Sequence, residues 1–352
     1  MMEVQSLLRQ AAERKASDIF ISVGTPPVFK INGELTAASQ EKLSVDAAES
    51  LVRSLFMKKE DLERYIGEGE VDFSISLQGV GRFRISAYTQ RGSMAAVIRV
   101  LRFDSLNLDE LHIPEQILEF HNNTKGLILV TGTTGSGKST TLSAIIDLIN
   151  RRRCCHILTL EDPIEYLHRH NKSIVNQREI GIDSVSYSRA LRSALRQSPD
   201  VILIGEMRDH DTVSIALTAA ETGHLVLSTL HTTSAAKTID RIIDVFPPNH
   251  QHQVRIQLAT TLQAVISQQL LPSVEGNRIP AFEIMVANSG IRNLIRDSKV
   301  HQIDAAIQTG KAHGMISMDM SIAGLYNEGK ITKEVALNHC ADRNVIAKYF
   351  KV

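Results

Sequence analysis

The stretch GTTGSGKST, residues 132–140, decides the fold of the second part of this 352-residue chain. It fits the pattern Gly-x-x-x-x-Gly-Lys-Ser/Thr, whose fixed positions are Gly132, Gly137, Lys138 and Ser139. The apolar run LILV precedes it and apolar residues at helical spacing follow it, which predicts a buried strand, a turn and a helix. Such a turn gathers backbone N–H groups at a helix start, where an anion is stabilised.

These residue types predict a site for ATP and Mg²⁺. The Lys138 ammonium would reach the β- and γ-phosphates, and the Ser139 hydroxyl would hold the magnesium ion. The predicted nucleotide-binding residues are Gly132, Thr133, Thr134, Gly135, Ser136, Gly137, Lys138, Ser139 and Thr140. A chance glycine loop is the alternative, but the strand before it and the helix after it argue against that reading.

Composition narrows the class of protein. Lys+Arg and Asp+Glu both number 39, so the chain lacks the basic character of a dedicated nucleic-acid binder, and no nucleic-acid partner is expected. Cys154, Cys155 and Cys340 provide neither a disulfide framework nor a Cys-x-x-Cys zinc pair, which indicates a reducing, cytoplasmic compartment. No apolar run approaches the ~20 residues of a membrane-spanning helix, so direct membrane insertion is not expected.

The pattern along the chain predicts two domains. Residues 1–101 alternate helical and strand patterns in the manner of a small α+β domain, and the broken periodicity of 102–114 predicts a linker. From 115 to 352, helical stretches separate short strands that are apolar throughout, which is typical of a parallel sheet covered on both faces. Beyond about residue 273 we expect a helical C-terminal region.

Two acidic positions follow predicted strands of this sheet. Glu206 comes after the strand 201–204, and Glu161 comes after the strand 156–160. In open α/β sheets, ligands bind at the carboxyl ends of the strands, so both carboxylates are expected near the phosphates. We assign Glu161 as the base that polarises the attacking water and Glu206 as a ligand of Mg²⁺ through water, although the sequence leaves the reverse assignment open.

His231 follows a third predicted strand, next to two threonines. It could sense the γ-phosphate, or it could be a packing histidine with its hydrogen bonds satisfied inside the fold. The sequence does not decide between the two, and we keep His231 as a candidate catalytic residue.

Four motifs, taken in their order along the chain, resemble those of a known protein superfamily. The phosphate loop, LEDPIEY, GEMRD and GHLVLSTLH resemble the secretion ATPase superfamily that powers type II secretion and type IV pili. The resemblance covers nearly the whole chain. It implies a PAS-like N-terminal domain, a RecA-like ATPase domain, and a homohexameric ring with ATP at the junctions between domains and subunits.

Within that superfamily the chain is most similar to the pilus-retraction branch, which drives twitching motility. It has no four-cysteine zinc module, and GIRNLIRDSK resembles the signature of that branch, with Gly290 for alanine and Asp297 for glutamate. The resemblance implies that Arg292, Asn293 and Arg296 couple the ring to its partners. Those partners would be an inner-membrane pilus platform protein and a related accessory retraction ATPase, at the inner face of the cytoplasmic membrane.

Arginines form two candidate sets. In GRFRISAY, Arg84 lies on the strand face opposite the apolar residues, and Arg99 interrupts an apolar strand, where a buried arginine would need an anionic partner. Their spacing matches the family's phosphate-contacting pair, so both are expected to neutralise charge as the γ-phosphate leaves. A second set, Arg189, Arg192 and Arg196, lines one side of a predicted helix and faces either a neighbouring subunit's nucleotide or solvent.

Three other functions stay open at this point. The same type of motor could assemble pili or drive secretion, and a RecA-like DNA translocase or a nucleotide-binding regulator without turnover are alternatives of a different class. Neutral net charge counts against the translocase, and the presence of both Glu161 and Glu206 counts against the regulator.

Overall fold

The structure, a computed structural model, describes residues 3–31, 33–102 and 107–350. The chain divides into two compact units, residues 1–105 with 165–169 and residues 106–164 with 170–352. The predicted linker 102–114 includes residues 103–106, which lie outside the described residues, and its later part contains a 3₁₀ helix, η1 (Leu108–Leu111).

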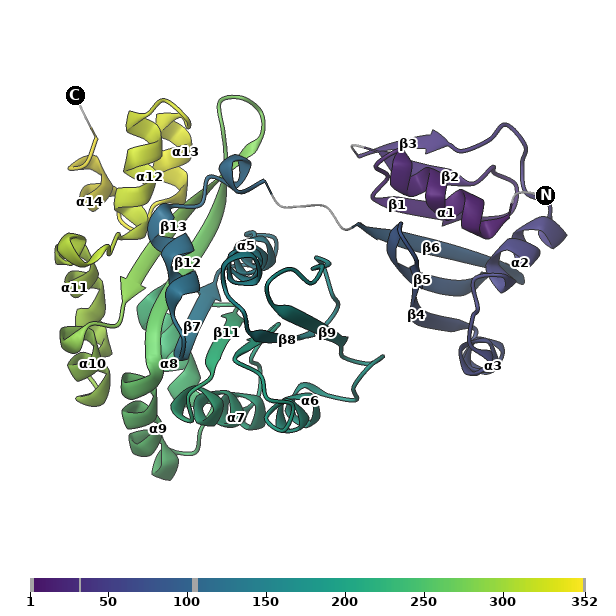
Figure 1. Ribbon diagram of the computed structural model, residues 1–352. Coiled ribbons are helices and arrows are strands. Elements are labelled where there is room, and N and C mark those ends of the chain that lie inside the picture. The colour runs from purple at the N-terminus through teal and green to yellow at the C-terminus, as the bar shows by residue number, and fades with distance from the viewer. Residues whose placement is uncertain (1–2, 32, 103–106, 351–352) are drawn as a thin grey trace. The chain divides into compact units, whose positions relative to one another are not determined.

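The first unit is a mixed sheet-and-helix domain (Figure 1). Its elements are α1 (Val4–Glu13), β1 (Asp18–Ile21), β2 (Val28–Ile31), β3 (Glu34–Ala37), α2 (Val45–Arg53), α3 (Lys59–Glu68), β4 (Glu70–Leu77), β5 (Gly81–Gln90) and β6 (Ser93–Arg102). The strands form an antiparallel sheet in the order β3-β2-β1-β6-β5-β4.

Strand alternation places the core of this unit on one face of the sheet. Phe83, Ile85 and Ala87 of β5 are fully buried, as the sequence pattern predicts, and they join a cluster with residues of α1 and α2. Successive strand residues point to opposite faces, so Arg82 and Arg84 lie on the other face.

The second unit is built on a longer sheet. Its strands are β7 (Gly126–Thr131), β8 (His156–Glu161), β9 (Ile174–Glu179), β10 (Val201–Ile204), β11 (Leu225–Leu230), β12 (Leu262–Pro272) and β13 (Arg278–Val286). The order is β13-β12-β7-β11-β10-β8-β9; all neighbours are parallel except β12 and β13, which pair antiparallel. The parallel sheet expected from the apolar strands is therefore present.

Helices cover both faces of this sheet (Figure 1). They are α4 (Glu115–Leu118), η2 (Glu119–Asn122), α5 (Lys138–Arg152), α6 (Tyr187–Ala194), α7 (His210–Glu221), α8 (Ala235–Asp244) and α9 (Pro248–Thr261). Alternate residues of β7 enter different cores: Ile128 and Val130 pack with α5, whereas Leu127 and Leu129 pack with α6 to α9. Because β7 is buried on both sides, its sequence is apolar without a break.

The region after residue 273 departs from the prediction. It begins with β13, which pairs with β12 through a turn at 273–277, so the C-terminal region is not helical from that point. Helices follow: α10 (Ser289–Arg296), η3 (Val300–Gln302), α11 (Ile303–Thr309), η4 (Lys311–His313), α12 (Met318–Asn327), α13 (Lys333–His339) and α14 (Arg343–Ala347). Apolar residues of α12 to α14 pack against the ends of β12 and β13, including Leu271 and Ile279.

Within the described ranges, no helix is long and apolar enough to cross a membrane.

Candidate active site

The phosphate loop connects β7 to α5 as predicted. Gly137 is the N-cap of α5, with a left-handed φ of 89°, and Lys138 is the first helical residue. The Lys138 ammonium is buried at the loop and donates to the carbonyl oxygens of Gly132 (3.0 Å) and Thr133 (2.9 Å). These contacts hold the one positive side chain of the motif over the loop that gathers backbone N–H groups at the start of α5.

The position of Gln268 in β12 explains why two loop positions, 132 and 137, need glycine. A Cβ added to Gly132, whose φ is 146°, would lie 2.4 Å from the Gln268 carbonyl oxygen, and a Cβ on Gly137 would lie 2.7 Å from the Gln268 amide nitrogen. The same side chain accepts a hydrogen bond from the Thr141 hydroxyl of α5 (2.7 Å). Gln268 is thus a buried wall of the loop, and the sequence analysis did not identify it because β12 itself was not predicted.

Glu206 follows β10 at the carboxyl edge of the sheet, where the sequence predicted it. Thr229 of β11 holds the turn on both sides of this residue: its hydroxyl donates to the Gly205 carbonyl (2.6 Å), and its own carbonyl accepts from the Met207 N–H (3.2 Å). The Glu206 side chain is only 14% exposed and its Oε1 lies 2.6 Å from Arg208 Nε. Its position is therefore fixed by backbone and side-chain contacts.

Glu161 is the last residue of β8, the neighbour of β10. Its Oε1 accepts hydrogen bonds from the Thr159 hydroxyl (2.6 Å) and from the Gln177 side-chain amide (3.1 Å). Both donors are neutral, which contrasts with the arginine beside Glu206. The two predicted carboxylates thus lie at the carboxyl ends of adjacent parallel strands, and each is held by side-chain contacts.

Tyr187, the first residue of α6, lies near these two acidic positions and was not predicted. A Cβ on Gly205 would lie 2.7 Å from the Tyr187 hydroxyl, so this glycine makes room for the ring. Burial raises the pKa of the Tyr187 phenol, and the carboxylates of Asp162, Glu206 and Glu161 raise it further. The phenol therefore keeps its proton in the electrostatic field of these three carboxylates.

His231 comes directly after β11, and its Nε2 lies 3.4 Å from Glu206 Oε2. His231 therefore contacts the glutamate that was predicted to hold Mg²⁺ through water. The His231 side chain is about half exposed (46%). The hydroxyls of the neighbouring Thr232 and of Thr238 are hydrogen-bonded to each other (2.7 Å), which anchors the loop that carries His231 to α8. The pair Glu206–His231 can couple the charge of the carboxylate to the loop after β11.

Oxygen donors of the type that Mg²⁺ prefers are present at the predicted position. Ser139 is the second residue of α5, and Glu206 supplies a carboxylate at the same edge of the sheet. In the described parts of the chain, no group of three or more His, Cys, Asp or Glu residues could hold a metal ion by protein ligands alone. The donor set fits an ion held by few protein oxygens together with phosphate oxygens and water.

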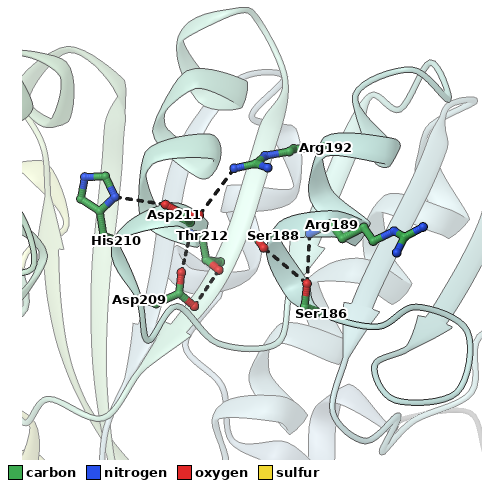
Figure 2. Close-up of polar contacts among 8 residues, drawn as sticks. All are labelled: Ser186, Ser188, Arg189, Arg192, Asp209, His210, Asp211 and Thr212. Carbon is green, nitrogen blue, oxygen red and sulfur yellow. Dashed lines mark hydrogen bonds and ion pairs between the residues drawn. The ribbon is translucent and has the colours of Figure 1, made fainter.

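The second arginine set is partly engaged within the fold. Figure 2 shows Arg192 of α6 reaching Asp211 of α7, at 3.5 Å, while the guanidinium of Arg189 points away from this group. Asp211 also contacts His210 (3.3 Å), and Arg196 donates to the Arg192 carbonyl (3.0 Å). Arg192 therefore ties α6 to α7, which the helical pattern alone did not show.

Comparison with known proteins identifies the family. A model of the type II/IV secretion system protein family matches residues 2–278. The chain belongs to this family. It is 46% identical over 337 residues to the type IV pilus retraction ATPase PilT of Pseudomonas aeruginosa (95% of this chain, 97% of the relative). It is 45% identical over 334 residues to a twitching motility protein of Neisseria gonorrhoeae (95% and 89%).

A solved structure agrees with this assignment. The crystal structure of the pilus retraction motor PilT with bound ADP matches with a TM-score of 0.90 and 44% identity, covering 99% of this chain and all (100%) of the other. The predicted resemblance is thereby confirmed, and so is the predicted fold class, an N-terminal domain followed by a RecA-like ATPase domain.

The arginines that the family resemblance selected in the first unit form a pair. Arg84 of β5 and Arg99 of β6 are directly opposite in the register of the two strands. The expectation that Arg99 is buried is wrong, since its side chain is 65% exposed; the expected anionic partner is Asp18 of β1, 3.4 Å away. Arg84 lies 3.7 Å from Asp72. Like charges placed opposite each other do not stabilise a sheet, which leaves room for a role outside folding.

The signature GIRNLIRDSK forms α10. Ile291 and Ile295 are buried, and Arg292 is only partly exposed. Its Nη1 donates to the carbonyls of Ala259 (2.6 Å) and Thr260 (2.8 Å) at the end of α9. Arg292 is therefore engaged within the fold. The other arginine, Arg296, contacts the Asn293 side chain (3.1 Å) and is exposed.

Proposed function

We propose that this chain is an ATP-hydrolysing motor that drives retraction of type IV pili. The observation that carries the proposal is the match, over nearly its full length, to a pilus retraction ATPase. The second unit provides the parts that hydrolysis needs: a phosphate loop with an ordered lysine, and carboxylates held at the ends of two adjacent strands. ATP is the substrate, and ADP and phosphate are the products.

Each side chain has a distinct part in the reaction. Lys138 neutralises charge on the β- and γ-phosphates. Glu161 accepts a proton from water as the water oxygen attacks the γ-phosphorus and the bond to the β-phosphate oxygen breaks. When bound, Mg²⁺ would be held by Ser139 and, through water, by Glu206, and would neutralise developing phosphate charge.

The proposal also gives roles to His231, Arg84 and Arg99. His231 reports the state of Glu206 to the loop after β11, since the two side chains are in contact. Arg84 and Arg99 neutralise charge that develops during phosphoryl transfer. Lys138, Glu161, Glu206 and His231 belong to the second unit.

The partners follow the same proposal. We expect a homohexameric ring that works in the cytoplasm at the inner face of the cytoplasmic membrane. There it would engage an inner-membrane pilus platform protein through the exposed side of α10, with a related accessory retraction ATPase beside it. Nucleic acid is not expected among the partners.

Gene deletion tests the proposal directly. Cells without the gene should make pili that extend but do not retract, scored by imaging of labelled pili. Wild-type protein should restore retraction, and Lys138→Ala should not, because it lacks the charge that holds the phosphates. Lys172→Ala, which changes an exposed lysine after β8, is the matched control and should restore it. Loss of pili on deletion would instead identify an assembly motor.

A further inference from the structure

A row of buried polar side chains crosses three strands of the second unit. Thr131 is the last residue of β7, Ser267 of β12 is paired with it, and Glu283 of β13 is paired with Ser267. All three residues are buried, and the Thr131 hydroxyl donates to the Ser267 hydroxyl oxygen (3.0 Å). Residues paired across strands have side chains on the same face of the sheet. Glu283 therefore shares a face with the residue that directly precedes the phosphate loop.

The Glu283 carboxyl group binds backbone N–H groups at the start of two helices. Its Oε1 accepts a hydrogen bond from the N–H of Ala235, the first residue of α8 (2.8 Å). The N–H of Met318, the first residue of α12, also donates to it. Burial raises the pKa of Glu283, and the two N–H groups oppose this shift because they stabilise the charged form. A carboxyl group is costly to bury, so these contacts, rather than packing, account for a glutamate at this position.

The start of α8 is in turn tied to the loop 231–234, which carries His231. The Thr238 hydroxyl of α8 donates to the carbonyl oxygen of Ser234, the N-cap of the helix (2.7 Å). The same hydroxyl is hydrogen-bonded to the hydroxyl of Thr232 (2.7 Å). A displacement of the first turn of α8 would therefore displace the loop and the histidine at its beginning.

We propose that Glu283 is a positioning residue for ATP hydrolysis. By holding the first turn of α8, it fixes the loop 231–234 and so the contact between His231 Nε2 and Glu206 Oε2 (3.4 Å). The inference rests on the proposed function, in which Glu206 and His231 take part in hydrolysis. Loss of the Glu283 acceptor slows turnover although every side chain assigned to the nucleotide is kept, because a small displacement of a catalytic group lowers the rate.

Steady-state ATP hydrolysis by the purified full chain tests this role. Glu283→Leu has a side chain of similar size that cannot accept a hydrogen bond. It should lower kcat about tenfold or more and keep the ATPγS affinity within about twofold of wild type. Glu283→Gln retains an oxygen for the Ala235 N–H and should keep kcat within about threefold. The matched control is Asp319→Leu, which removes a buried carboxylate that accepts from the N–H groups of Ala341 and Asp342. Its kcat should stay within about twofold of wild type.

Two further variants distinguish positioning from a folding defect. Ala235→Pro removes the N–H that Glu283 accepts, and proline is tolerated at the first position of a helix. Its kcat should fall as in Glu283→Leu. In a His231→Ala background, Glu283→Leu should lower kcat by no more than about a further twofold, because both substitutions disturb the same contact.

Four results would overturn the positioning role. They are a normal kcat in Glu283→Leu (or in Ala235→Pro, if Glu283→Leu does not fold), effects of Glu283→Leu and His231→Ala on kcat that multiply, an equal loss of kcat in Glu283→Gln and Glu283→Leu, and an equal loss in Asp319→Leu. A wild-type chain that does not hydrolyse ATP would instead overturn the proposed function.

Discussion

Arg84 of β5 and Arg99 of β6 lie directly opposite each other in an antiparallel pair, each with a carboxylate within 4 Å. Such a like-charge pair does not stabilise the sheet, so its expected role is in phosphoryl transfer. Arg84→Ala or Arg99→Ala should lower kcat about a hundredfold or more, with little change in nucleotide affinity, because the charge acts mainly in the transition state.

Stability and a control variant distinguish this role from a structural one. Either substitution should change the free energy of unfolding by less than about 1 kcal/mol. Arg53→Ala, which breaks an exposed ion pair with Glu49 in the same unit, should leave kcat unchanged. A normal kcat in both arginine variants would make the pair structural.

Substitutions of Glu161 and Glu206 should have different effects on ATP hydrolysis. Glu161 accepts hydrogen bonds from neutral donors, whereas Glu206 is held by Arg208 and His231. Glu161→Gln should bind ATP and Mg²⁺ normally and lose turnover, because an amide cannot accept the proton of water. Glu206→Gln should shift the magnesium dependence of turnover to higher concentration. Normal turnover in Glu161→Gln would reverse the two assignments.

Local patterns were enough to predict much of this site. The phosphate loop, Glu161 and Glu206 lie at predicted strand ends because buried parallel strands are apolar throughout and end at one edge of the sheet. Gln268 could not be found this way, since it reaches the loop only through the pairing of β12 with β7. A signal for that strand did exist: apolar runs flank the turn at 273–277, which contains Glu-Gly-Asn.

The errors have the same physical origin. The exposure of Arg99 depends on which face of β6 the core occupies, and its partner Asp18 is a sheet neighbour 81 positions away. Arg292 binds carbonyls at the end of another helix, which helical spacing within α10 cannot show. Periodicity describes one element, whereas these contacts are set by how elements pack.

Gly132 and Gly135 of the phosphate loop allow a test of whether Gln268 restricts the space beside the loop. Gly132 and Gly135 both have positive φ, 146° and 78°, so alanine carries a backbone cost of about 1–2 kcal/mol at either position. Only at Gly132 would the added Cβ also meet a backbone atom, the Gln268 carbonyl at 2.4 Å. Gly132→Ala should therefore abolish ATPγS binding, and Gly135→Ala should weaken it only modestly. Equal losses in the two variants would show that φ alone explains these glycines.

His168 makes stability depend on pH. Burial lowers the pKa of this imidazole from 6.5 to about 4, so the folded chain favours the neutral form. The stabilisation is fully present above pH 6.5 and is lost as the pH falls from 6.5 toward about 4, with an upper bound of about 3.4 kcal/mol. Thermal midpoints across this window should fall less steeply for His168→Gln than for wild type. His313→Gln, at an exposed position, should follow the wild type; identical slopes for all three would exclude His168 as the cause.

The two arginines of α10 should have separable effects. Arg292 donates to the carbonyls of Ala259 and Thr260, so Arg292→Ala should cost about 1–3 kcal/mol of unfolding free energy by leaving them without that donor. Arg296 is exposed, and Arg296→Ala should change stability by less than about 0.5 kcal/mol.

The docking role proposed for α10 therefore depends on Arg296. Cells that carry Arg296→Ala should fail to retract labelled pili, although the purified protein keeps the oligomeric state of the wild type and its ATPase rate. Arg343→Ala removes an exposed arginine elsewhere in the same unit and should retract normally. Arg296 takes no part in the hydrogen bonds by which Arg292 holds α9. A loss of ATPase activity in Arg296→Ala would therefore mean that α10 is needed for ATP hydrolysis rather than for docking. Normal retraction in that variant would refute the docking role.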